Sequence, residues 1–354
     1  MTPLSLTHLR LSLRATTDVI LDGHMAGNNL RNALANVMLH ATCPETHRRA
    51  KPTPEHAAAC PACWLLAAET DPGSVVRAYA VVPPLPPRER VSAGESFAFG
   101  LTLFGDGFRF LPYLVLAAAE MGRVGVGPGR RDGLGRFRLE EIWSFNPYTG
   151  ERRQLLAPDS SLVRVEAAPI EPAHAAAAAV RLDEQLSAGG HALSVRFLSP
   201  TRLEENGRLF RAPDFAVFFR RLLYRIDDLA RQFAGGERRD PDSVAALARA
   251  ADRVRLVDAR THWVDLWSWS GRKGEKTPVG GFIGTAVYQT DDWLPLLPWL
   301  LLGQGTQVGK STVKGAGVFE VGAPAPAYWD WWVARPDGEL QGETSRGDLR
   351  IGFA

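Results

Sequence analysis

The chain has 354 residues, of which 45% are apolar and 23% are charged, a composition typical of a well-buried globular protein of about two domains. The formal net charge of +2 does not indicate nucleic acid, so any basic surface has to be local. No apolar run is long enough to cross a membrane, and the N-terminal sequence lacks the apolar core of a signal peptide. Only three cysteines occur, which argues against a disulfide framework and favours a cytoplasmic protein.

The first half of the chain predicts elements in the order βαββαβ, which is the ferredoxin-like (RRM-like) pattern. Strands are expected where apolar residues alternate, and helices where they recur at helical spacing. We therefore place a first domain at residues 1–156. Its predicted strands are 9–15, 75–82, 96–103 and 136–142, and its predicted helices are 27–39 and 110–121.

A shift in composition over residues 157–190, which are rich in alanine and include Gly189-Gly190, predicts a linker. A second domain is placed at 191–322, and a tail with three tryptophans at 323–354 is expected to pack on that domain or on a partner. The predicted elements of the second domain are strands 191–198, 283–289 and 318–321 and helices 214–233, 242–252 and 293–302.

The two halves share a sequence pattern that indicates a tandem duplication. In each half an apolar helix is followed by a basic, glycine-rich loop and then by Gly-x-Gly-x-Phe-x-(Leu/Val). The pattern reads Gly133-Leu134-Gly135-Arg136-Phe137 in the first half and Gly315-Ala316-Gly317-Val318-Phe319 in the second. We therefore expect an α+β protein with two tandem ferredoxin-like domains.

The second glycine-rich loop is suited to a phosphate backbone, because glycines let backbone N–H groups approach an anion beside a lysine. A Walker A loop is excluded because Gln304 stands where glycine is needed, and a dinucleotide fingerprint is excluded by Val308. In the first loop, Arg130 and Arg131 are the corresponding cations. The candidate ligand-binding residues of the second loop are Gly305, Gly309, Lys310, Ser311, Lys314, Gly315 and Gly317.

A cysteine- and histidine-rich insertion over residues 40–70 of the first domain predicts a structural zinc site. Thiolate and imidazole ligands suit tetrahedral zinc, and Cys43, His47, Cys60 and Cys63 form two paired arms. His56 and His40 are alternative fourth ligands. The competing interpretation is that the cysteines are free and buried and that the histidines face solvent.

Residues 262–276 combine three tryptophans with cations that include Arg272 and Lys273. Aromatic faces stack on unpaired bases and cations hold phosphates, so this segment could cover RNA. The four-residue spacing of Trp263 and Trp267 instead favours a helical stripe that faces the core.

Four blocks in order resemble the CRISPR-associated RAMP superfamily, and within it the endoribonuclease that cleaves repeat RNA. They are Gly27-x-x-Leu30-Arg31-x-Ala33-Leu34, the stretch 193–203, Trp263…Ser270…Arg272 and the second glycine-rich loop. The resemblance spans residues 4–322. It implies binding of CRISPR repeat RNA, cleavage of precursor CRISPR RNA into guide RNAs, other CRISPR effector subunits as partners, and no readout of DNA and no membrane.

The resemblance also implies a metal-independent reaction, in which the ribose 2′-OH attacks the adjacent phosphate and leaves a cyclic phosphate. Such chemistry needs a base, an acid and cations. In the family these groups lie in or just after the first helix, where this chain has His24, Arg31 and His40. Two other function classes stay open: a non-catalytic RAMP subunit that holds RNA in an effector complex, and a zinc-bearing protein-interaction module without RNA.

Overall fold

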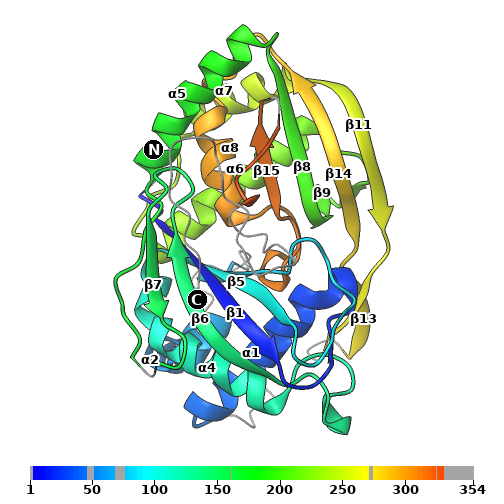
Figure 1. Cartoon of the computed structure of the whole chain (residues 1–354). Coiled ribbons are helices and arrows are strands. Elements are labelled where there is room, and N and C mark those ends of the chain that lie inside the picture. The colour runs from blue at the N-terminus through cyan, green and yellow to red at the C-terminus, as the bar shows by residue number, and fades with distance from the viewer. Residues whose placement is uncertain are drawn as a thin grey trace, which may run out of the picture.

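Two antiparallel sheets, one from each half of the chain, form the framework of the protein (Figure 1). The computed structural model describes residues 3–45, 52–67, 76–160, 162–270, 274–323 and 325–330. The strand order is β3-β5-β1-β6-β7 in the first sheet and β11-β14-β8-β15 in the second. The two sheets have the same topology. If the four main strands of each half are numbered 1 to 4 along the chain (β1, β3, β5, β6 and β8, β11, β14, β15), their order across each sheet is 2-3-1-4. The predicted mixed α+β class is confirmed.

The first sheet is built from β1 (Leu6–Ala15), β3 (Tyr79–Val82), β5 (Ser96–Phe104), β6 (Phe137–Phe145) and β7 (Arg152–Leu156). Helices α1 (Ala26–Thr42) and α4 (Leu111–Val124) pack against each other, and α4 packs on β6. The smaller elements of this half are β2 (Val19–Ile20), β4 (Arg90–Val91), α2 (Pro54–Ala59), α3 (Pro61–Ala67), and the 3₁₀ turns η1 (Gly23–Met25), η2 (Gly105–Phe110) and η3 (Arg130–Asp132).

The second sheet is built from β8 (Ala192–Thr201), β11 (Arg255–Val264), β14 (Gly281–Gln289) and β15 (Phe319–Gly322). Helices α6 (Phe215–Phe233), α7 (Pro241–Asp252) and α8 (Leu297–Thr306) accompany it, with α6 between α7 and α8. The smaller elements are two hairpins, β9 (Leu203–Glu205) with β10 (Arg208–Phe210) and β12 (Trp267–Ser270) with β13 (Glu275–Pro278), and the turn η4 (Thr312–Lys314).

Helix α6 shows why the predicted helices form where they do. Asp214 accepts a hydrogen bond from the backbone N–H of Val217 at 2.9 Å, so the helix begins at a side-chain cap, as predicted. Apolar residues then recur at helical spacing and are buried, including Phe218, Leu222 and Ile226. Phe218 packs on Phe197 and Phe319 of the second sheet, and α6 also packs against α8.

An additional helix, α5 (Pro172–Ala188), occupies much of the segment predicted as a linker. Alanine is the strongest helix former, and the helix starts with Pro172 after a Glu171 cap, so the composition shift marked a helix. The helix packs along α8 of the second half.

Strand β1 is buried on both faces. Leu9 and Leu11 lie on one face, and residues 325–330 cover the other face. Residues alternate across a strand, so Leu9 and Leu11 share one face and His8 lies on the other. The ring of His8 bonds Thr102 Oγ1 at 2.8 Å and the Tyr328 hydroxyl at 2.7 Å. Burial lowers the pKa of His8 to about 3. Trp329 donates from Nε1 to the Phe319 carbonyl, so the tail packs on both halves.

Direct hydrogen bonds hold the two halves together near the glycine-rich loops. The Tyr148 hydroxyl donates to the Leu301 carbonyl at 2.6 Å, and Gln307 Nε2 donates to the Val81 carbonyl at 2.7 Å. All the groups involved are buried or nearly so. Helix α8 and the loop after it are thereby fixed relative to the first half.

The prediction of a helical stripe at Trp263 and Trp267 is wrong. Trp263 lies in β11 and Trp267 in the separate strand β12, and the Trp267 side chain is 58% exposed. Asp265 and Leu266 interrupt the strands. Within the described part of the chain, no helix is long and apolar enough to cross a bilayer.

Candidate active site and metal centre

The second glycine-rich loop meets the start of α1, and glycines on both sides make the approach possible. A Cβ atom at Gly27 would lie 2.4 Å from the Lys314 carbonyl oxygen and 3.0 Å from the Gly315 Cα. Gly315 itself has a φ of 85°, in the left-handed region that favours glycine. Turn η4 therefore rests directly on the first turn of α1 and brings the Lys314 side chain to it.

Several of the loop's backbone amides donate hydrogen bonds within the protein, so these amides do not face an anion. The N–H groups of Lys310 and Gly317 donate to the carbonyls of Arg202 and Pro200, and those of Lys314, Gly315 and Ala316 donate within the turn. Gly305 lies inside α8, where a Cβ would meet Leu6 at 2.5 Å. These glycines serve close backbone packing, and the charge offered to a ligand comes from side chains.

The two glycine-rich loops share one backbone frame. Val308 donates to the Gly317 carbonyl at 3.0 Å, and Val126 donates to the Gly135 carbonyl at 2.9 Å. Helix α4 ends at Val124 and α8 at Thr306, and β6 begins at Phe137 and β15 at Phe319, so corresponding residues are 182 positions apart. The duplicated pattern expected from the sequence is present in the structure.

A hydrogen-bonded chain joins Lys314 to α1 through the β12–β13 hairpin. Lys314 Nζ donates to Ser268 Oγ at 3.3 Å, and Ser268 Oγ donates to Asn28 Oδ1 at 3.0 Å. Lys314 is half-buried, and burial lowers its pKa, with the nearby positive charge of Arg31 acting in the same direction. Two cations from opposite halves thus lie close together over one end of α1.

His24 lies in η1, one turn before this junction, and is half-buried. Burial is the main cause of a lowered pKa at His24; the Glu89 carboxylate opposes the shift, and His262 adds to it. The site therefore contains a second histidine, His262, which β11 contributes from the other half and whose side chain is exposed. Sequence reasoning missed this neighbour because the pattern of a single strand does not say which helix it faces.

His40, the other predicted histidine, lies at the opposite end of α1. Its Nδ1 contacts the Asn36 carbonyl at 2.7 Å, and the side chain is exposed. At a rise of about 1.5 Å per residue, the two ends of α1 are about 24 Å apart. His24 and His40 therefore cannot act on one phosphate, and His24 shares its end of the helix with Lys314.

The other predicted cations differ in their availability. Lys310 is 54% exposed and pairs with Glu204 at 3.6 Å, and Ser311 adopts a left-handed φ of 62° at the start of η4. Arg130 and Arg131 are exposed on η3. Arg272 and Lys273 lie outside the described residues, as does His47.

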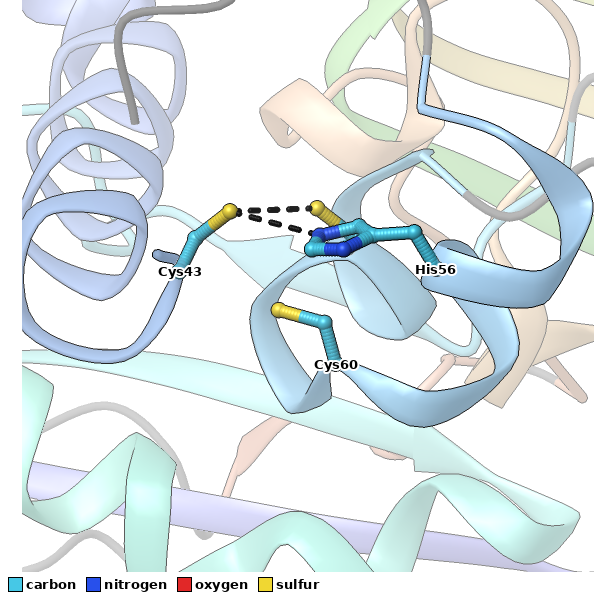
Figure 2. Close-up of side chains that lie close together, drawn as sticks. Cys43, His56 and Cys60 are labelled. Atoms are coloured by element: carbon cyan, nitrogen blue, oxygen red, sulfur yellow. Dashed lines mark hydrogen bonds between the residues drawn. The ribbon is translucent and has the colours of Figure 1, made fainter. Parts of the chain in front are cut away.

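A compact cluster of three cysteines and one histidine lies between the end of α1 and the short helices α2 and α3 (Figure 2). The ligand atoms of Cys43, His56, Cys60 and Cys63 lie within 4.8 Å of one another. Cys43 Sγ lies 3.5 Å from His56 Nε2 and 3.7 Å from Cys63 Sγ. Burial is the main cause that raises the pKa of Cys63 to about 12, and the neighbouring thiols add to it.

This donor set fits a metal ion, because three thiols and an imidazole converge on one point as tetrahedral coordination requires. His56, the alternative fourth ligand from the sequence, supplies the imidazole in the described structure. His40 does not belong to the cluster.

Two family models match this chain, each over less than half of its length. Residues 195–319 match the family model described as CRISPR-associated endoribonuclease Cas6, and residues 4–168 match a second model described as an N-terminal domain. The predicted resemblance to CRISPR-associated RAMP-type endoribonucleases is thereby confirmed. No curated protein gives a match to the chain.

Solved structures of Cas6 proteins share the fold at low identity. A partial Cas6-RT-Cas1–Cas2 complex matches with a TM-score of 0.57 and 14% identity over 100% of this chain and 49% of that one. A second structure, described as a Cas6-RT-Cas1–Cas2 complex, gives the same score and identity over 30% of its chain. Thermus thermophilus Cas6 matches with a TM-score of 0.50 and 16% identity over 91% of this chain and 99% of that one. The chain thus spans about half or less of the first two proteins.

Proposed function

We propose that the protein is a CRISPR-associated endoribonuclease that binds repeat RNA and cleaves precursor CRISPR RNA at the junction of α1 and η4. The observation that carries the proposal is the placement of cations and histidines at the start of α1. Lys314 packs there with Arg31 nearby, and His24 lies in the turn just before the helix with His262 near it, in a chain of which residues 195–319 match the Cas6 model. The equal strand orders and matching loop frames support two tandem ferredoxin-like domains.

The reaction needs only side chains that this site contains. His24, held in its neutral form by a lowered pKa, takes the proton from a ribose 2′-OH, and the 2′ oxygen attacks the adjacent phosphorus. The bond to the 5′ oxygen breaks, and His262 gives that oxygen a proton. Lys314 and Arg31 stabilise the additional negative charge on the phosphate oxygens. The products are a 2′,3′-cyclic phosphate and a 5′-OH.

The metal centre lies at the far end of α1 and takes no part in this chemistry. We propose that Cys43, His56, Cys60 and Cys63 hold zinc and fix α2 and α3 to the end of α1. Four protein ligands leave no open position for a water or substrate, so the ion's role is structural. Catalysis in a chelator would be consistent with this assignment.

The partners follow from the same resemblance. The solved relatives include a Cas6-RT-Cas1–Cas2 complex and a product complex of Cas6, so CRISPR RNA and other CRISPR proteins are the partners we propose for this chain. The alternative, a RAMP subunit that holds RNA without cutting it, would use the same cations and would not need the histidines.

The test is cleavage of labelled repeat RNA from the chain's own CRISPR array, in EDTA, by the wild type and by His24→Ala, His262→Ala and His40→Ala. We expect one cut with cyclic-phosphate ends, a loss of about 10²- to 10⁴-fold for the first two variants, and a rate close to wild type for His40→Ala. RNA with a 2′-deoxyribose at the cut should bind and stay intact. Binding without cleavage by the wild type would instead establish the non-catalytic subunit, and full activity in both His24 and His262 variants would refute the site.

A further inference from the structure

A cavity lies beside the proposed active site and shares only Arg31 with the chemistry above. Its volume is about 830 Å³, within the range of pockets that hold small ligands. Its walls come from α1, from the first glycine-rich loop, from the metal centre and from the tip of the β12 strand. The lining residues used below are Asn32, Asn36, Arg31, Arg130, Arg131 and Trp269.

Three arginines face this cavity without a carboxylate partner among the described residues. Arg31 donates only weakly, from Nη1 to Asn32 Oδ1 at 3.4 Å, and its buried Nε has no hydrogen-bond partner. Arg130 and Arg131 are exposed on η3 and form no ion pair with any described acid. Many other arginines of this chain pair with an acid, as Arg14 does with Glu140. Unpaired guanidinium groups in a hollow fit phosphate oxygens.

An exposed tryptophan stands at the same cavity. The Trp269 side chain is 64% exposed, although its strand is firmly held: the neighbouring Ser268 is buried and bonds Asn28 and Lys314. An indole fixed in this way is a platform on which an unpaired base can stack. Trp267 lies two residues earlier on the same strand and is 58% exposed, but it does not line the cavity.

The face of α1 that lines the cavity carries amide side chains. Asn29, Asn32 and Asn36 recur at helical spacing, and Asn36 is exposed. Amides both donate and accept hydrogen bonds, so they can contact base edges and the 2′-OH of a ribose. Glu45 and Asp132 also line the cavity, so the lining is mixed in charge and not a general cation surface.

We propose that this cavity binds unpaired nucleotides of the RNA next to the cut, with a base stacked on Trp269 and the following phosphates on Arg130 and Arg131. Arg31 connects the cavity with the proposed active site, since it lines the cavity and its charge lowers the pKa of Lys314. The RNA therefore passes from the α1–η4 junction into the cavity. The inference rests on the proposed function and adds the RNA segment and the residues that hold it. Double-stranded RNA is excluded from the stacking position because its bases are already stacked.

The experiment measures the dissociation constant of the blocked repeat RNA, with a 2′-deoxyribose at the cut, at several salt concentrations. We expect Trp269→Ala to weaken binding roughly 5- to 150-fold. The double variant Arg130→Ala/Arg131→Ala should lower the slope of log affinity against log salt by about 1.4, at about 0.7 for each phosphate contact with a single strand. The matched controls are Trp267→Ala and Arg249→Ala; Arg249 is an exposed arginine on α7. Both control variants should bind the blocked RNA with the dissociation constant of the wild type.

The outcomes separate this inference from the proposed function. If the cavity variants bind the blocked RNA as tightly as the wild type, the proposal that the cavity binds RNA is overturned, whether or not the protein cleaves. If the wild type binds but does not cleave and the cavity variants bind more weakly, the proposed function is overturned and RNA binding by the cavity is supported. Pairing the nucleotides beside the cut with a complementary strand should weaken binding by wild type, and unchanged affinity for that duplex would overturn the stacked base.

Discussion

Gly27 offers the sharpest test of the contact between the two halves. In an isolated helix, Gly27→Ala would be stabilising by about 1 kcal/mol, because glycine loses more backbone freedom than alanine. Here the new Cβ would lie 2.4 Å from the Lys314 carbonyl oxygen, where an ordinary contact is 3.4 Å or more. Turn η4 would have to withdraw by about 1 Å, and Lys314 would move with it. A misplacement of that size can cost about 100-fold in rate, or about 2.7 kcal/mol.

The assay is single-turnover cleavage of repeat RNA, together with urea unfolding of the same protein. We expect about a 100-fold slower cut and a loss of no more than about 2 kcal/mol in the free energy of unfolding, since overpacking and helix propensity act in opposite directions. The control is Gly150→Ala in the turn between β6 and β7, where φ is 74° and no atom lies within 4 Å of the place that the new methyl group would occupy. That change should cost about 1–2 kcal/mol of stability and leave the rate unchanged.

Two results would refute the reasoning at Gly27. One is wild-type cleavage by Gly27→Ala, which would mean that the position of η4 on α1 is irrelevant to the reaction. The other is an equal loss of cleavage in Gly150→Ala, which would mean that the assay reports stability and not the geometry of the site.

Three further outcomes follow from the same contacts. Lys314→Ala should slow single-turnover cleavage about 10²- to 10³-fold. Lys310 already pairs with Glu204, so Lys310→Ala should change the rate by less than about threefold; equal losses would contradict the assignment of Lys314 to the phosphate. His8 has a folded pKa of about 3, below its ordinary 6.5, so the unfolded chain binds the proton first and stability is lost as pH falls through this window. Urea unfolding should show about 2 kcal/mol of this loss between pH 7 and pH 5, and His8→Gln should remove that part of the pH dependence; an unchanged pH dependence would argue against it. Elemental analysis should find one zinc per chain in the wild type and little in Cys60→Ser, with a lower midpoint of thermal unfolding in the variant; a metal-free wild type of unchanged midpoint would disprove the metal centre.

The sequence predicted most of the secondary structure because the relevant signals are local. The Asp214 cap and the apolar stripe of α6 are both properties of one segment, and both are confirmed. The repeated Gly-x-Gly-x-Phe pattern is also local, and it predicted two loops whose backbones correspond at a constant spacing. Periodicity failed at Trp263 and Trp267, since a four-residue spacing is shared by a helical face and by two strands with a break between them.

The site was only partly predictable because it is assembled from both halves. Nothing in β11 alone indicates that His262 approaches His24, and nothing in a run of glycines shows that carbonyls of Arg202 and Pro200 use the loop's N–H groups. The clustering of cysteines in the insertion did predict three members of the cluster, Cys43, Cys60 and Cys63, since they are close in the chain. His56 could be chosen over other histidines only after α2 had been placed beside Cys43.

The two glycine-rich loops share a backbone frame but differ in the side chains that they expose. Turns η3 and η4 occupy the same backbone frame, so Arg130, Arg131 and Asp132 correspond to Thr312, Val313 and Lys314. In η4 the first two positions are covered by α1 and β3, Thr312 is buried and Val313 packs against the core, which leaves only the third position for a ligand. In η3 the first two positions are exposed and cationic, and the third is acidic. We therefore propose that turn η4 presents Lys314 to the cut, whereas turn η3 presents Arg130 and Arg131 to the RNA strand beside it.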